Sequence, residues 1–211
     1  MVKSVNEPKG TSGYVPSSRE RMLVAAKHLF AQDGYENTTT SAIARQAGTS
    51  ESQLIKHFGS KEGLLEAIFD QGWESMSYIF TAIHSLHSPA EKLEVMLELV
   101  ITNFNRDPEL KQLMLLEGRR IRKEGHMVLL TKGYLRFIGV VDAIIAEMAA
   151  SGELRPDLSK DAVRSALNSM FEGMQRDQVL AERMGFPADY DTPQMLKIFK
   201  LVLGAFTRPH G

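Results

Sequence analysis

The sequence predicts an all-α protein of nine helices. Apolar residues recur at helical spacing almost without interruption beyond Ser60. Three later segments open with a capping residue followed by proline, which is the pattern of a helix start: Ser88-Pro89, Asp107-Pro108 and Thr192-Pro193. No stretch shows the alternation that a convincing strand requires.

The N-terminal residues 1–17 are rich in Ser, Gly, Pro and Lys and lack periodicity, which predicts a disordered tail. The first helix begins after Ser17, where Glu20 completes a capping box, and ends at Gly34. One face of this helix is apolar and carries Met22, Ala26, Leu29 and Phe30.

Two short helices follow in the stretch TTTSAIARQAGTSESQLIKHFGSK, residues 38–61, with Gly48 at the turn between them. The second ends at Gly59, and Ser60 opens a longer helix. Two crossed helices require small residues at the crossing and apolar residues beneath it, and the sequence provides Ile43, Ala44, Ala47 and Leu54 at these positions. The pattern predicts a three-helix domain over residues 18–62 that contains a helix-turn-helix.

Residues 63–211 form the second predicted domain. A long helix from near Lys61 carries the apolar stripe from Leu65 to Ile83. The following helices are expected at about 89–104, 108–123, 127–150, 160–184 and 193–207, with breaks at Gly125 and at SGELRPDLS.

Composition limits the possible functions. The net charge of -1 argues against a protein that coats nucleic acid, so any DNA contact must be local. Residues 1–62 hold eight Lys/Arg against six Asp/Glu, whereas the remainder holds 17 against 20. No cysteine is present, and no apolar run is long enough for a membrane span, so a cytoplasmic protein without a membrane partner is expected.

The second helix of a helix-turn-helix lies in the major groove of double-stranded DNA. Gln53 and Lys56 are the candidates for base contact, because Gln pairs with adenine and Lys reaches guanine or phosphate. Gln53 also stands three residues after Ser50, where its side chain could instead fold back on the helix cap. The full predicted set of DNA-contacting residues is Thr39, Thr40, Ser50, Ser52, Gln53, Lys56, His57 and Lys61, with the threonines and Lys61 placed for phosphate at helix N-termini.

The order GYENTTTSAIARQAGTSESQLIKHFGSKEGLL resembles the N-terminal region of TetR/AcrR-type bacterial transcriptional regulators. The resemblance covers residues 17–66 closely. Ala42 stands where the family usually has an acidic residue, Ile55 where it has a phosphate-gripping tyrosine, and Ser52 where a glycine is frequent. The resemblance implies a repressor of a palindromic operator, a homodimer formed by the last two helices, and a C-terminal cavity for a small effector.

Large, adaptable side chains on the middle helices predict where that effector binds. The candidate residues are Trp73, Met76, Phe80, Phe104, Met114, Glu117, Phe137, Met170 and Met174. Met96, Phe171 and the polar residues Asn103, Asn168, Glu172 and Gln175 belong to the same stripes. A filled apolar core accounts for the same pattern.

No enzyme motif supports a catalytic function, and no metal or cofactor is expected. His84 and His87 stand three apart on a helix, but no third ligand at suitable spacing accompanies them. The alternative to a regulator is a helical interaction protein in which the helix-turn-helix is vestigial. The sequence leaves open the ligand, the operator and the choice between repressor and activator.

Overall fold

The computed structural model describes residues 15–120 and 127–207. Its helices are α1 (Ser18–Asp33), α2 (Thr40–Gln46), α3 (Glu51–Phe58), α4 (Lys61–Ser75), α5 (Tyr78–His84), α6 (Pro89–Arg106), α7 (Pro108–Leu116), α8 (Lys132–Ala150), α9 (Lys160–Met184) and α10 (Thr192–Phe206). The described residues contain no strand, and an isolated bridge joins Leu154 to Thr207. The all-α class is therefore confirmed, while most of the expected tail lies outside the described residues.

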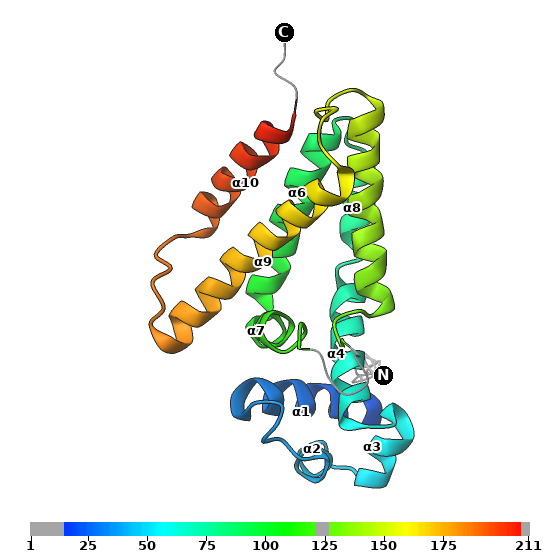
Figure 1. Ribbon diagram of the computed structural model, residues 1–211. Helices are drawn as coiled ribbons and strands as arrows, with labels where there is room; N and C mark the ends of the chain where they lie inside the picture. Colours follow the sequence, from blue (N-terminus) through cyan, green and yellow to red (C-terminus); the bar gives the residue numbers. More distant parts are fainter. Residues whose placement is uncertain (1–14, 121–126, 208–211) are drawn as a thin grey trace, which may run out of the picture.

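The molecule has a small head and a larger body (Figure 1). Helices α1, α2 and α3 form the head, and α4 leads from the head into the body. Within the body, α8 packs against α4, α6 and α9, while α10 packs against α6 and α9. The head rests on the body mainly through α1, which contacts α4 and α7.

The long helix expected over the stripe from Leu65 to Ile83 is divided at Met76 and Ser77. The Met76 N–H donates to the carbonyl of Trp73 at 3.1 Å, and the Ile79 N–H donates to that of Met76 at 3.0 Å. Such tighter three-residue bonds change the direction of a helix without breaking its apolar stripe. Ten helical segments result in the described residues, or the expected nine if α4 and α5 count as one interrupted helix.

Two boundaries in the middle of the chain differ from the sequence prediction. Helix α7 ends at Leu116 instead of near Lys123, because the Gly118 N–H turns back to the Leu113 carbonyl at 3.1 Å. Helix α8 begins only after Thr131, whose hydroxyl caps the Tyr134 N–H at 3.2 Å. The apolar run before this cap resembles a helical stripe, but it forms a loop in which Val128 and Leu129 are buried and Leu130 is exposed.

Proline-led helix starts are confirmed at α6 and α7, where Ser88 and Asp107 are the caps. At α10 the cap is Asp191, one residue earlier than expected, and Gln194 completes a capping box with it. Short side chains at these positions satisfy helical N–H groups that otherwise lack partners.

A single apolar core runs from the head through the body. The helices α4 and α8 approach closely at Gly133, whose N–H donates to the Asp70 carboxylate at 2.8 Å. Beside this crossing, the Trp73 ring packs against those of Tyr134 and Phe137, with centroids 5.4 Å and 4.8 Å apart. The position of α4, and hence of the head, therefore depends on how the body packs around Trp73.

Candidate nucleic-acid interface and ligand pocket

The two helices of the helix-turn-helix are shaped by local caps. The Thr39 hydroxyl accepts the Ala42 N–H at 3.1 Å, and the Ser50 hydroxyl accepts the Gln53 N–H at 3.3 Å. Gly48 has a φ of 61°, which its turn requires and other residues rarely adopt. The expected anchors Ile43, Ala44, Ala47 and Leu54 are all buried. These features confirm a helix-turn-helix over α2 and α3.

The outward face of α3 is polar and open to solvent. Its exposed residues are Glu51, Ser52, Gln53, Ile55, Lys56 and His57. The Gln53 backbone N–H donates to the Ser50 side chain that caps α3. At α1 and α10 the side chain of the corresponding residue also accepts the backbone N–H of the cap, which completes a capping box, whereas α3 as described has no such second bond. The Gln53 amide is thus not folded back on the cap. A side chain that projects from this face can reach base edges in a groove.

The side chains of Arg21 and Lys61 donate hydrogen bonds to backbone carbonyls of the head. The Lys61 ammonium donates to the carbonyls of Tyr35 at 2.8 Å and Thr38 at 3.0 Å, and it lies 4.3 Å from the Tyr35 ring centroid. The Arg21 guanidinium donates to the Ala47 carbonyl at 2.9 Å. The predicted contact of Lys61 with phosphate would require its ammonium to leave these three groups of the preceding loop, and it stays a prediction.

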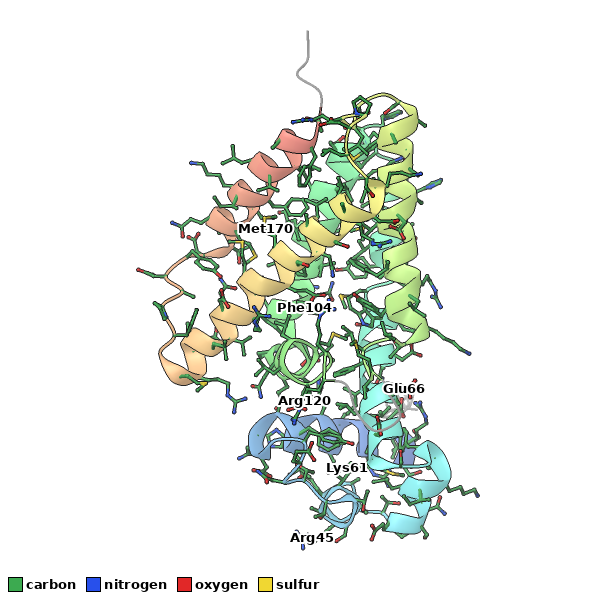
Figure 2. The ribbon with its side chains drawn as sticks, in the orientation of Figure 1. Arg45, Lys61, Glu66, Phe104, Arg120 and Met170 are labelled. Atoms are coloured by element: carbon green, nitrogen blue, oxygen red, sulfur yellow. The ribbon has the colours of Figure 1, made fainter. Side chains whose placement is uncertain are left out.

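Several hydroxyls that were expected to contact DNA form hydrogen bonds within the head instead. The Thr40 hydroxyl donates to the Glu51 carboxylate, which links α2 to α3. The Ser50 and Ser52 hydroxyls bond each other at 2.9 Å. Arg45, which sequence reasoning did not single out, is exposed at the end of α2, on the side of the head farthest from the body (Figure 2). The sequence could have indicated Arg45 as a DNA contact, because it is a cation in the last turn of a short helix that has few exposed positions.

An apolar pocket lies in the body between α6, α8, α9 and α10, with about 470 Å³ of space including its mouth. Ten of its eleven lining residues are apolar, and Asn168 is the polar one. The wall consists of Leu93, Met96, Leu97, Val100, Phe137, Ile138, Val141, Leu167, Asn168, Phe171 and Phe199. This lining suits a small, largely apolar molecule, and the enclosed space of about 50 Å³ would have to widen to admit it.

A polar network borders the pocket at Asn168. The Asn168 amide donates to the Glu172 carboxylate at 3.0 Å, and Arg119 forms an ion pair with the same carboxylate. Burial raises the pKa of the Tyr134 phenol, which also interacts with Asn168 and Arg119. Hydrogen bonding to Glu172 raises the pKa of Arg119 despite its partial desolvation. At neutral pH the network therefore holds one cation, one anion and neutral hydrogen-bonding groups.

Comparison with known proteins identifies the head. Residues 22–68 match the family described as bacterial regulatory proteins, tetR family. The tetR-family match thus covers α2, α3, most of α1 and the first half of α4. As in solved structures of similar fold, this head is joined to an all-helical body.

Two curated relatives illustrate the range of similar sequences. The HTH-type transcriptional regulator UidR of Escherichia coli K12 is 25% identical over 161 residues, which are 76% of this chain and 81% of that protein. The nucleoid occlusion factor SlmA of Aliivibrio fischeri is 29% identical over 114 residues, 51% of this chain and 58% of SlmA. The match thus spans little more than half of SlmA.

The fold of the whole chain is similar to that of FadR from Bacillus subtilis, which was solved in complex with stearoyl-CoA. The TM-score is 0.77 at 20% sequence identity, with 89% of this chain and 98% of FadR covered. At this identity the likeness concerns the fold.

Most of the predicted effector residues do not line the pocket. Phe137 does, as do Met96, Asn168 and Phe171 from the wider stripes. Trp73, Met76, Phe104 and Met114 are buried core residues, and Glu117 pairs with Arg120 at 3.2 Å. Phe80, Met170 and Met174 are partly buried against the core instead. Periodicity shows which residues face inward but not which of them border empty space.

Polar contacts join the tetR-family head to α7 of the body. The Lys27 ammonium pairs with Asp107, the cap of α7, at 2.5 Å, and the Gln112 amide donates to the Ala31 carbonyl at 2.8 Å. His28 lies 2.8 Å from the Glu109 carboxylate. Because α7 directly follows the pocket helix α6, a displacement at the pocket can reach α1 through these contacts.

Residues 15–120 and 127–207 contain neither a metal-binding cluster nor a membrane-spanning helix. No group of three or more His, Cys, Asp or Glu side chains there is placed to hold a metal ion. In the same residues no helix is both long enough and apolar enough to cross a bilayer.

Proposed function

We propose that this chain is a sequence-specific DNA-binding transcriptional regulator that a small apolar or amphipathic ligand releases from a palindromic operator. The observation that carries the proposal is the exposed polar face of α3 on a capped helix-turn-helix, joined by α4 and α7 to a body with an apolar pocket. Repression is the expected mode of action. The stearoyl-CoA bound to the FadR of similar fold supports an apolar ligand for this body.

DNA binding rests on α3. Gln53 and Lys56 are its candidates for base contact, and the side chains of His57 and Arg45 are also exposed. Thr39, Thr40, Ser50 and Ser52 would lie near phosphate at the two helix starts, after exchanging their internal partners for it. Ile55 is 45% exposed and supplies no phosphate hydrogen bond, so this head depends more on its cations.

A homodimer is the expected assembly, because one short reading helix covers too few base pairs for useful specificity. The surface formed by the end of α9, the following loop and α10 supports this part of the proposal. It exposes Met184, Phe186, Ile198 and Leu201, although large apolar side chains are usually buried. A second copy on this surface would place two heads side by side.

Ligand response follows from the connections of the pocket. A ligand that separates α6 from α8 would shift α7 through its junction with α6 and α4 through its packing on α8. Both helices contact α1. The separation of the two heads in a dimer would then change, and an operator with fixed half-site spacing would be released.

The test of DNA reading begins with selection of binding sites from a random duplex library by the full chain. The double variant Q53A/K56A is expected to lose at least tenfold affinity for the selected site and much less for random DNA. The matched control is K132A/K160A, which removes exposed cations from the starts of α8 and α9. Equal losses on selected and random DNA would contradict base reading, and failure to select any site would favour the helical interaction protein.

The test of the dimer is the sedimentation of L201E. Leu201 is 62% exposed on α10, and a carboxylate buried in an interface would be strongly unfavourable. We expect L201E to be monomeric and to bind the selected site weakly. The control L135E changes a comparably exposed leucine on α8 and should sediment as wild type does. A dimeric L201E would place the interface elsewhere.

A further inference from the structure

The indole N–H of Trp73 has no acceptor. Its Nε1 atom is buried and makes no hydrogen bond in the part of the chain that the structure describes, and the whole side chain is 7% exposed. Buried N–H groups of native proteins almost always have a partner, so such a group requires an explanation. A ligand that carries an acceptor would provide one.

Trp73 lies one ring behind the wall of the apolar pocket. Its ring centroid is 4.8 Å from that of Phe137, which lines the pocket. On another side it is 6.5 Å from Phe104, which stacks at 6.1 Å on Phe171, a second wall residue. Figure 2 shows Phe104 in the middle of the body. A rotation of the Phe137 side chain would therefore extend the pocket to the indole.

The charges around this end of the pocket favour a neutral acceptor. Asn168 and Arg119 both donate to the Glu172 carboxylate, so the cation is already paired. The same carboxylate would repel an anionic ligand group. Tyr134, whose ring lies 5.4 Å from that of Trp73, keeps its proton because burial raises its pKa. The indole N–H of Trp73 and the hydroxyl of Tyr134 are therefore neutral donors, which suit a carbonyl oxygen.

We propose that the Trp73 Nε1–H donates to a neutral carbonyl oxygen, as in an ester, thioester or ketone, on an apolar chain that fills the pocket. This inference rests on the proposed function, which requires a ligand in this pocket. Trp73 belongs to α4, whose first residues are in the head. The carbonyl would thus hydrogen-bond the ligand to the helix that leads to the DNA-binding face, while the apolar chain of the ligand occupies the space between α6 and α9.

The test compares probes with and without the carbonyl. Methyl esters of straight-chain acids from about six to sixteen carbons and hydrocarbons of equal length are titrated into the full chain, and affinity is measured by displacement of an apolar fluorescent dye. The emission of Trp73, the one tryptophan of the sequence, reports whether the probe reaches the indole. We expect the best ester to shift this emission saturably and to bind at least tenfold more tightly than its hydrocarbon.

The Trp73→Phe variant isolates the hydrogen bond. It should weaken the ester about tenfold and the hydrocarbon less than twofold, which is the signature of a specific pair in a double-mutant cycle. The control Phe104→Leu changes an apolar neighbour of Trp73 and should affect both probes alike. If Trp73→Phe does not fold, replacement of Trp73 by benzothienylalanine removes the N–H and keeps the ring shape.

Three results would overturn the inference. They are equal weakening of ester and hydrocarbon by the loss of the N–H, failure of every ester in the series to bind, and tighter binding of the free acids than of their esters. None of these measurements contains DNA. A chain that passes them but selects no operator would refute the proposed function alone, whereas operator binding without ester binding would refute this inference alone.

Discussion

Gly133 allows the close crossing of α4 and α8, and its replacement by alanine gives the sharpest test of this packing. A Cβ at position 133 would lie 2.6 Å from the Cβ of Trp73 and 3.1 Å from the Asp70 carboxylate. Carbon atoms in contact prefer separations of about 3.5–4.0 Å. The Trp73 Cβ is fixed to the backbone and cannot rotate away, so α4 and α8 must separate by about 1 Å.

The cost of this separation can be estimated. Overpacking of a core position typically costs about 1–3 kcal/mol. The shift also weakens the 2.8 Å bond from the Gly133 N–H to Asp70, which caps the start of α8. We expect a loss of roughly 2 kcal/mol in the free energy of unfolding. For a chain of this length, that loss lowers the melting temperature by roughly 4–8 °C.

The measurement is thermal unfolding of Gly133→Ala beside Gly139→Ala, followed by circular dichroism. Gly139 belongs to the same helix, is exposed, and would place its Cβ in open space. Alanine there should raise stability by up to about 1 kcal/mol through its helix propensity. If Gly133→Ala melts at or above the wild type, the close contact between α4 and α8 does not exist as described and the reasoning fails.

Two further predictions concern the half-buried Lys61 and the buried Lys111. Lys61→Met should destabilise the chain by about 2 kcal/mol in urea unfolding, because the carbonyls of Tyr35 and Thr38 lose a charged donor; unchanged stability would return Lys61 to a role on the surface. Lys111 is 6% exposed, and burial lowers its pKa from 10.5 although Glu182 opposes the shift. The folded state then binds fewer protons than the unfolded state between that lowered pKa and 10.5, so the stability contribution of Lys111 improves as pH rises through this window. Lys111→Met should therefore have a melting temperature a few degrees above that of the wild type at pH 7, which corresponds to about 1 kcal/mol of unfolding free energy. This difference should shrink toward pH 10. A difference that does not change with pH would refute desolvation of the Lys111 charge as its cause.

Local patterns in the sequence predicted the head well. The caps at Ser17, Thr39 and Ser50 act on N–H groups only three residues away, so the sequence contains both partners of each interaction. The turn at Gly48 is equally local. The same reasoning misplaced the start of α8, since the apolar residues before Thr131 have the spacing of a helical stripe although they form a loop.

The sequence by itself determined the all-α class, the helix-turn-helix and most helix starts, because these depend on caps, turns and periodicity within a few residues. Only the tertiary structure decided the partners of Lys61, which stand 26 and 23 positions earlier in the chain. It also decided that Phe137 lines the pocket and that Trp73 lies behind it, because both face inward and the distinction depends on how α4, α6, α8 and α9 cross. Helical spacing specifies a face of one helix, whereas empty space arises between several helices and belongs to none of them.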